Sequence, residues 1–124
     1  MAKFLDDSLY DAALNVVKNT GTEMYICSSQ PATRAAAITA SLATKTGLTS
    51  TSYTGVTNGD VSGRKLTKNA ETGISVTATG SATHAAICSG SLLLAVTPIV
   101  SQVVTIGNTI NTPVFDIEFP DVTQ

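Results

Sequence analysis

The spacing of hydrophobic and polar positions changes once along this chain, near Gly21. Between residues 6 and 18 the apolar residues recur every three or four positions, which indicates an amphipathic helix. Asp6 is a residue type preferred at a helix N-cap, and Gly21 is suited to ending a helix. We therefore predict a helix over 6–18 and expect its apolar stripe to pack on a sheet. The stripe consists of Leu9, Ala12, Ala13, Val16 and Val17.

Beyond Gly21 the chain is dominated by short segments that alternate in polarity or are rich in β-branched residues, separated by Gly, Pro, Asn and Ser. The segments that we expect to be strands are 23–29, 64–69, 73–79, 82–88, 92–97, 99–106 and 113–119. The stretch "CSGSL" predicts a hairpin turn between two of them. This pattern predicts a mainly β fold: an antiparallel β-sandwich or barrel, jelly-roll-like, with one N-terminal α-helix packed on it.

Two segments before residue 64 fit this pattern less well. The stretch 32–47 mixes alanines, which favour helix, with threonines, which favour extended chain, so a short helix and an irregular arm both remain open. Residues 48–63 are mostly Thr, Ser, Gly and Asn, which predicts a loop. The length of the chain predicts one domain over 1–124, in which 1–5 form an N-terminal arm and 64–119 form antiparallel strands.

Charged residues make up only 13% of the chain, about half the usual quarter of a globular protein. All seven Lys and Arg residues lie in the first 68 positions, and no charged residue occurs from Thr72 to Phe115. Exposed strands normally carry Lys and Glu, which prevent edge-to-edge pairing. Two interpretations therefore stay open for residues 72–115: a surface that meets other protein, and a solvated face covered by hydroxyl groups.

The single histidine and the second cysteine lie close together in "SATHAAICSG". On a strand, His84 and Cys88 share a face but are about 13 Å apart, too far for a nucleophile and its base. We therefore predict that His84 is a strand residue without a catalytic role. Cys27 and Cys88 are predicted to be small buried residues, although a disulfide formed after release into an oxidising medium stays open.

Other sites and settings receive little support from the sequence. One His and two Cys without a spaced set of carboxylates do not supply a zinc site, and we expect no metal or cofactor. A net charge of −2 makes nucleic-acid binding by a basic face improbable. The start of the chain lacks the apolar segment of a signal peptide, and no apolar run approaches the length of a membrane span. We expect a non-enzymatic protein that is made in the cytoplasm and binds neither nucleic acid nor membrane.

Three stretches carry a resemblance to a known family. They are "FLDDSLYDAALNVVKNTGTEMYICSSQP", "GDVSGRKLT" and "ATGSATHAAICSGSLLLAVTPIVSQVVTIGNTINTPVFDIEFPD". In the order of these segments and in their residues, they resemble small virion structural proteins of tailed bacteriophages, which are described as capsid decoration (cement) or structural proteins. The resemblance runs from Phe4 to about Asp121 and matches no short functional motif. It implies a β-rich protein of the capsid surface, without enzymatic activity, in the virion.

This resemblance leads to specific expectations about partners. A decoration protein binds the major capsid protein and itself, as a homotrimer, and many weak contacts add up on the shell. The residues that we expect to contact the capsid or a neighbouring subunit are Lys3, Phe4, Leu5, Thr77 and Val96. The first three belong to an arm that can add a strand to a neighbouring sheet, or alternatively cover the chain's own core. Thr77 and Val96 lie in the charge-free stretch, where an introduced Lys is expected to weaken assembly at an interface.

Two other functions stay open at this point. A head–tail adaptor or tail-tube subunit would use 48–63 as a mobile loop that lines or stacks rings. A glycan-binding surface domain would stack sugar rings on exposed aromatic residues, but the chain has no Trp and only three Tyr and three Phe.

Overall fold

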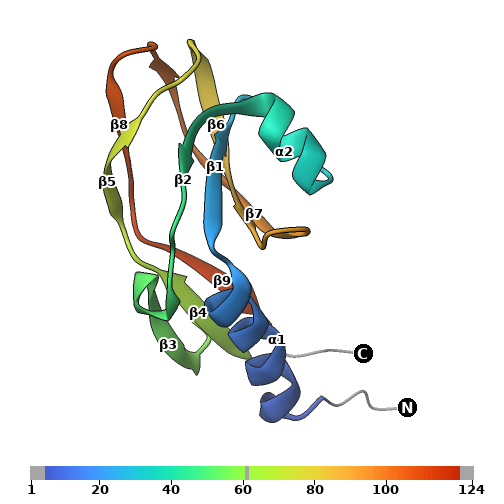
Figure 1. Ribbon diagram of the computed structural model, residues 1–124. Coiled ribbons are helices and arrows are strands. Elements are labelled where there is room, and N and C mark those ends of the chain that lie inside the picture. The colour runs from blue at the N-terminus through green and yellow to red at the C-terminus, as the bar shows by residue number, and fades with distance from the viewer. Residues whose placement is uncertain (1–4, 61, 121–124) are drawn as a thin grey trace.

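The computed structural model describes residues 5–60 and 62–120, which form an elongated molecule with α1 at one end (Figure 1). Helix α1 spans Asp7–Thr20 and begins where the sequence predicts. The Asp6 carboxylate caps it by accepting a hydrogen bond from the Ser8 N–H at 2.9 Å, which satisfies one of the free backbone donors of the first turn.

The largest sheet has four antiparallel strands. In spatial order they are β2 (Ser41–Lys45), β1 (Glu23–Cys27), β6 (Gly80–Cys88) and β7 (Leu93–Val104). A short helix, α2 (Arg34–Ala40), connects β1 to β2 and lies on the outer face of the sheet (Figure 1). The order makes β6 an interior strand and leaves β7 at the edge.

Two smaller antiparallel sheets complete the fold. The strands β3 (Tyr53–Asn58), β4 (Arg64–Lys68) and β9 (Phe115–Phe119) form one of them, beside α1; β5 (Glu71–Ser75) and β8 (Thr109–Thr112) form the other. A β-bridge between Ala43 and Val76 links the end of β5 to the β2 edge of the four-stranded sheet. The turn from β3 to β4 needs glycine at position 63, where φ is +72° and a side chain would collide with the Phe119 carbonyl.

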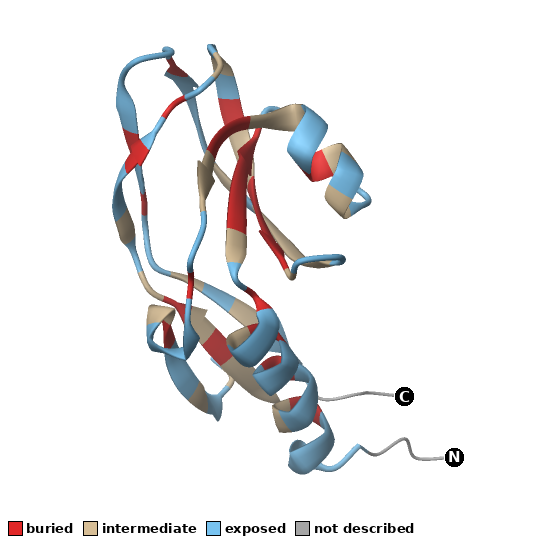
Figure 2. Cartoon of the chain, in the orientation of Figure 1, coloured by how far each residue is buried: buried red, intermediate tan, exposed pale blue. Residues whose placement is uncertain are grey.

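One continuous core runs along the molecule, between the four-stranded sheet and the two smaller sheets (Figure 2). Met24 and Ile26 of β1 and Ala85 and Ile87 of β6 are fully buried in it, because alternate side chains of each strand point to the same face. The opposite faces of β1 and β6 form a second, smaller cluster against α2. That cluster consists of Tyr25, Cys27, Ala37, Ala86 and Cys88.

The predicted fold class is confirmed: the protein is mainly β, with antiparallel, sandwich-like packing and an N-terminal helix. The stretch 32–47 forms both helix and extended chain: its alanine-rich part is α2, and the part from Ser41 is β2. The hairpin predicted at "CSGSL" is confirmed, and its turn is closed by a hydrogen bond from the Ser89 N–H to the Leu92 carbonyl at 2.9 Å.

Three predictions about individual elements are wrong. Residues 48–63 are not a loop, because Ser50–Ser52 form a 3₁₀ turn and Tyr53–Asn58 form β3, whose Tyr53 side chain is buried. The predicted strands 92–97 and 99–106 are one strand, β7, because Pro98 lies on its edge, where a missing N–H is tolerated. The short strand β8 was not predicted; its four residues are recognisable only through their pairing with β5.

The buried face of α1 also differs from the prediction. Tyr10, Leu14 and Val17 are buried, whereas Leu9 and Val16 are 56% and 52% exposed. Of the predicted stripe, only Val17 packs on the core. The reason is that apolar residues occupy more of the helix circumference than the β3–β4–β9 sheet covers.

Among the described residues, no helix has the length and apolar character needed to cross a bilayer.

Candidate functional site

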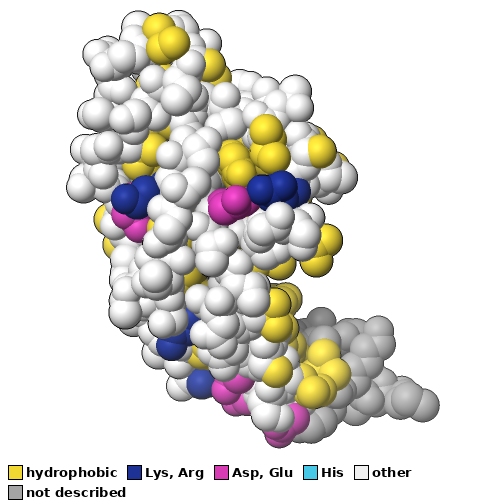
Figure 3. Space-filling model, viewed as in Figure 1, with side chains coloured by type: hydrophobic (Ala, Val, Ile, Leu, Met, Phe, Trp, Pro, Cys, Tyr) yellow, Lys and Arg dark blue, Asp and Glu magenta, His cyan; other side chains and the backbone are white. Residues whose placement is uncertain are grey.

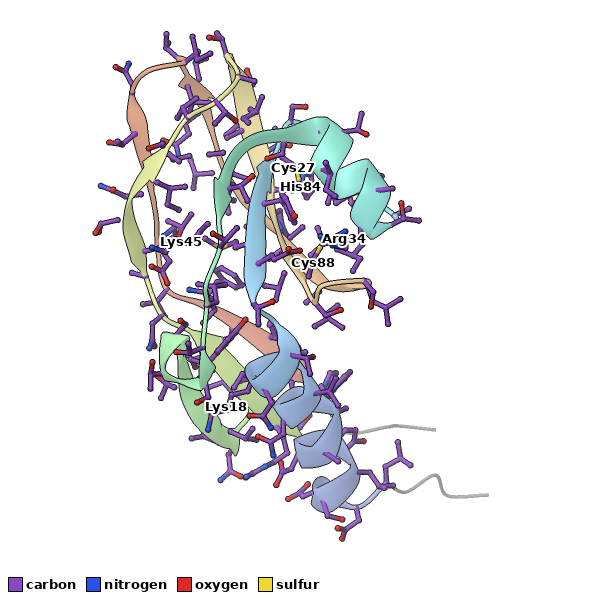
Figure 4. All side chains as sticks on the ribbon, in the orientation of Figure 1. Lys18, Cys27, Arg34, Lys45, His84 and Cys88 are labelled. Atoms are coloured by element: carbon purple, nitrogen blue, oxygen red, sulfur yellow. The ribbon has the colours of Figure 1, made fainter. Side chains whose placement is uncertain are left out.

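The histidine and the two cysteines lie on the outer face of β1 and β6, next to α2 (Figure 4). His84 is opposite Cys27 on the neighbouring strand, whereas Cys88 is opposite Glu23. Cys27 and Cys88 are therefore four residues apart along the sheet, about 13 Å. A disulfide needs Cα atoms within about 7 Å, so the two thiols stay free in this fold.

The Cys27 thiol is held in its protonated form. Its Sγ donates to the carbonyls of Tyr25 and Ala37, each at 3.6 Å. Burial raises the pKa of Cys27 to about 11, and Cys88 adds to this shift. A reactive cysteine has the opposite property, a lowered pKa in a partly exposed, electropositive setting. His84 is hydrogen-bonded through Nδ1 to the Thr83 hydroxyl at 2.9 Å, and the prediction that it is a strand residue is confirmed.

A second cluster of ionisable groups surrounds β4. The Lys68 side chain is fully buried, and its Nζ donates to the Asn69 carbonyl at 2.8 Å and to Glu71 Oε1 at 3.0 Å. The same Nζ lies 5.8 Å from the centre of the Tyr53 ring. Burial, and secondarily the Glu71 charge, raise the pKa of Tyr53 to about 12, and its hydroxyl donates to the Gly21 carbonyl. These contacts bind β4 to β3, β5 and the end of α1, so they account for the buried lysine as a structural element.

The other cations of β4 are also paired within the fold. The Arg64 guanidinium donates to both oxygens of Asp11, at 2.7 and 3.4 Å, which ties α1 to β4. Lys65 Nζ contacts Asp60 at 2.6 Å and Asp116 at 3.4 Å. Within 5–60 and 62–120, no three His, Cys, Asp or Glu side chains gather in a way that could hold a metal ion.

The clearest unused surface is on β7. One edge of this 12-residue strand pairs with β6, and no other described strand pairs with its second edge. Only Val104 is buried, while Val100 and Val103 are 88% and 77% exposed. We call Leu93–Val104 the β7 edge. It contains no charged residue, although long exposed edges in natural proteins are usually protected by charge.

Two features interrupt the β7 edge. Pro98 has no N–H, so it cannot donate to a strand on either side. Directly after it, β7 advances four residues, from Pro98 to Gln102, while β6 advances two, from His84 to Ala82. This irregularity is of the β-bulge type, and it accompanies the strong exposure of Val100. The β7 edge is therefore better suited to side-chain packing at Val100 and Val103 than to an uninterrupted backbone ladder.

A second unused apolar surface lies on α1. We call Leu9, Ala12, Ala13 and Val16 the outer stripe; all four residues are exposed, as is Leu5 just before the helix. Figure 3 shows hydrophobic side chains on the lower right of the molecule, over α1, and others across an indentation above it.

The structure places the five predicted contact residues in different settings. Lys3 and Phe4 lie outside the described residues, and Leu5 is exposed just before α1. Thr77 is exposed, although its N–H donates to the Leu42 carbonyl at 2.8 Å. Val96 is only partly exposed and packs against the cluster under α2, so a lysine there would disturb the fold as well as any interface. Leu5 precedes α1, Thr77 follows β5 and Val96 is on β7, so these three described residues lie on different elements.

Sequence reasoning missed the exposure of Val100 and Val103 on β7, the two most exposed large apolar residues described, and of Leu9 and Val16 on α1. For α1 a signal was present, because the apolar positions cover more of the helix circumference than one packing face needs. For β7 the sequence holds no comparable signal, since β6 is equally free of charge.

The chain matches no protein-family model, no curated protein and no solved structure. Its function is therefore inferred from its own surfaces.

Proposed function

We propose that this protein is a non-enzymatic structural subunit of a tailed-phage head, which binds the outer surface of the capsid shell and stabilises it as a decoration protein. The observation that carries the proposal is the β7 edge, a long, uncharged strand whose Val100 and Val103 side chains point into solvent. Isolated exposed apolar residues are common, but Val100 and Val103 are close together on an uncharged strand, and such exposed apolar side chains are suited to contact with protein even though Pro98 and the bulge limit backbone pairing.

The structure refines the argument from the charge-free stretch 72–115. Part of that stretch is β6, which is uncharged because it lies in the interior of the sheet. Strand β7 is half-buried from Leu93 to Thr97 but exposed from Val100 to Val103, so the lack of charge in this second half has no explanation in the chain's own core. The interface cores of protein complexes are depleted in charge in the same way.

On a capsid the partners are the major capsid protein and further copies of this chain, as a homotrimer. Each contact through Val100 and Val103 is small, but a shell holds many copies, and simultaneous contacts raise the effective affinity. Such a protein acts by geometry, because it bridges neighbouring capsid subunits and opposes their separation.

The alternative of a ring-forming adaptor or tail-tube subunit loses its supporting feature. It relied on a mobile loop at 48–63, and most of that segment is the 3₁₀ turn and β3.

The test is co-sedimentation of the purified protein with empty, expanded heads of its phage, together with its mass in solution. We expect stoichiometric coating of the heads, and we expect Val103→Lys to abolish coating without changing the denaturation midpoint. Thr46→Lys, at an exposed position after β2, is the matched control and is expected to coat normally. Coating by Val103→Lys at the wild-type level would remove the β7 edge from the interface. A ring of six or twelve copies that ignores the heads would contradict the whole proposal.

A further inference from the structure

Asn58 and Gly59 form the one Asn-Gly pair of the sequence, and Asn58 is the last residue of β3. The main-chain nitrogen that follows an asparagine can attack the side-chain amide of that asparagine, and a Cβ atom on the attacking residue hinders its approach. Glycine has no Cβ, so this pair is the least hindered in the chain. The other asparagines each precede Val, Thr or Ala; they are Asn15, Asn19, Asn69, Asn108 and Asn111.

The turn after β3 requires glycine at position 59. A Cβ atom there would collide with the Ser62 carbonyl and with Oε1 of Glu118. The fold therefore depends on the same residue that leaves Asn58 open to attack. Asn58 is also exposed, so water and hydroxide can reach its amide.

Both reacting groups are held in hydrogen bonds. Asn58 Oδ1 accepts from Arg64 Nη1 at 2.7 Å, and the Gly59 N–H donates to the Gly63 carbonyl at 2.9 Å. Asn58 and Arg64 are also opposite one another in the pairing of β3 with β4. The Gly59 nitrogen must lose its proton and reach Asn58 Cγ before a bond can form, so these contacts have to open first. Because a reaction within one molecule depends steeply on the position of the reacting atoms, the contacts slow it.

We propose that Asn58 is a deamidation site of this protein, and that its contact with Arg64 and the closed β3–β4 turn limit the rate in the folded state. The Gly59 nitrogen gives its proton to hydroxide and attacks Asn58 Cγ. The Cγ–Nδ2 bond then breaks, and the leaving nitrogen takes a proton from water and departs as ammonia. A second water opens the resulting five-membered imide at one of its two carbonyls, which gives either aspartate or isoaspartate at position 58. The proposal involves no capsid contact and goes beyond the proposed function.

The two products differ in their effect on the pairing of β3 with β4. An aspartate at position 58 faces Arg64 Nη1, while Nε and Nη2 of the same guanidinium hold Asp11. One guanidinium can therefore bind both carboxylates through charge-assisted hydrogen bonds. Isoaspartate instead lengthens the main chain by one carbon, which displaces Gly59 from its bond with Gly63. We expect the aspartate form to keep the last pair of β3 and β4 and the isoaspartate form to lose it.

Peptide mass spectrometry of the full-length protein tests the proposal without any substitution. The protein is incubated at mildly alkaline pH, folded in buffer and unfolded in urea, and then digested with trypsin. The tryptic peptide 46–64 contains Asn58 as its single asparagine. We expect this peptide to gain the mass of an amide-to-acid conversion before any other peptide, in both states. Its rate in the folded protein should be about tenfold lower than in urea, because the turn must open first.

Two variants that change the contacts of Arg64 sharpen the test. Arg64→Met removes the hydrogen bond to Asn58 and should raise the rate in the folded protein several-fold, towards the rate in urea. Asp11→Ala is the matched control, because it removes the other partner of Arg64 and leaves Nη1 to hold Asn58, so the wild-type rate is expected. Rates in urea should be equal in all three proteins, which separates an effect of the fold from an effect on the chemistry.

Several results would overturn the proposal. Equal rates in buffer and in urea would show that the turn gives no protection, and a faster reaction at another asparagine would place the site elsewhere. An unchanged rate in Arg64→Met would remove Arg64 from the proposal, and a slower one would show that the guanidinium activates the Asn58 carbonyl. A rate in Asp11→Ala as high as in Arg64→Met would assign the protection to the docking of α1 instead.

Discussion

The two ends of this molecule share one apolar core but differ in the ion pairs that are added to it. At one end, ion pairs join β4 to α1, to β9 and to the start of β5, and β4 supplies the cation in four of the five pairs found in the described residues. At the other end β6, β7 and β8 contain no charged residue and depend on apolar packing. We call these the ion-paired end and the charge-free end.

The difference shows that low charge has two causes within one stretch of sequence. Strand β6 is uncharged because both of its faces are covered, whereas β7, its direct neighbour, is uncharged although it is exposed from Val100 to Val103. The ion-paired end carries charged side chains that water solvates, and the charge-free end is suited to contact with protein. This contrast supports an assembly function more directly than composition alone.

The largest expected effect is at the ion-paired end. Lys68→Ala removes the buried partner of Glu71, and we expect it to lower the free energy of unfolding by about 4 kcal/mol, because a carboxylate is left with little solvent and no cation. Urea denaturation measures the change. In the double variant Lys68→Met/Glu71→Gln, which removes both charges, we expect recovery of a large part of the loss. A double variant as unstable as Lys68→Ala would show that packing, rather than charge, is what Lys68 provides.

At the charge-free end, the two neighbouring strands provide a matched pair of substitutions. Ile87→Ala on β6 empties a fully buried position and should cost about 3 kcal/mol in unfolding free energy. Val103→Ala on β7 should change it by less than about 0.5 kcal/mol, because that side chain is mostly in solvent. Denaturation of both variants under the same conditions checks the contrast, and similar costs would mean that β7 is not an open edge.

Alkaline pH tests the packing beneath α2. The pKa of Cys27 is raised from 9.0 to about 11, so the unfolded chain loses this proton at lower pH than the folded one. The stabilisation by the Cys27 thiol is complete below pH 9 and is lost as the pH rises to 11. About 1 kcal/mol of it is lost by pH 10. Denaturation midpoints at pH 8 and pH 10 measure it. The pKa of Tyr53 is raised to about 12, so its hydroxyl acts in the same direction at higher pH. The control is therefore Cys27→Ala, which removes the contribution of Cys27 and leaves that of Tyr53.

The smallest expected effect concerns an ion pair outside the ion-paired end, between Arg34 of α2 and Glu23 of β1, at 3.0 Å. Arg34→Ala should lower the free energy of unfolding only slightly, since both side chains are partly exposed and solvent screens the pair. The hydrogen bond from Arg34 lowers the pKa of Glu23, so this stabilisation is present above the ordinary pKa of a glutamate and is lost as pH falls. Denaturation at pH 7 and pH 3 should differ less in Arg34→Ala than in the wild type, and an unchanged difference would refute the coupling.

Much of the fold could be predicted because its signals are local. Asp6 caps α1 as expected, and the "CSGSL" turn joins two strands at the predicted place. The polar segment 48–63 misled the prediction because threonines and a single buried tyrosine look the same in a loop and in an edge strand. For the candidate site, the sequence indicated an uncharged interaction surface but selected Val96, which faces α2, rather than Val100 or Val103.

The sequence by itself determined the β-rich class, the position of α1, and the separation of charge between the two ends, because these depend on residues close together in the chain. Only the tertiary structure decided which charge-free strand is buried, that Cys27 lies opposite His84 rather than near Cys88, and which side of α1 faces the core. The reason is that strand order and helix docking are set by pairings between distant segments. Strands β6 and β7 are both free of charge, but β1 lies beside β6, whereas no described strand lies beside the second edge of β7.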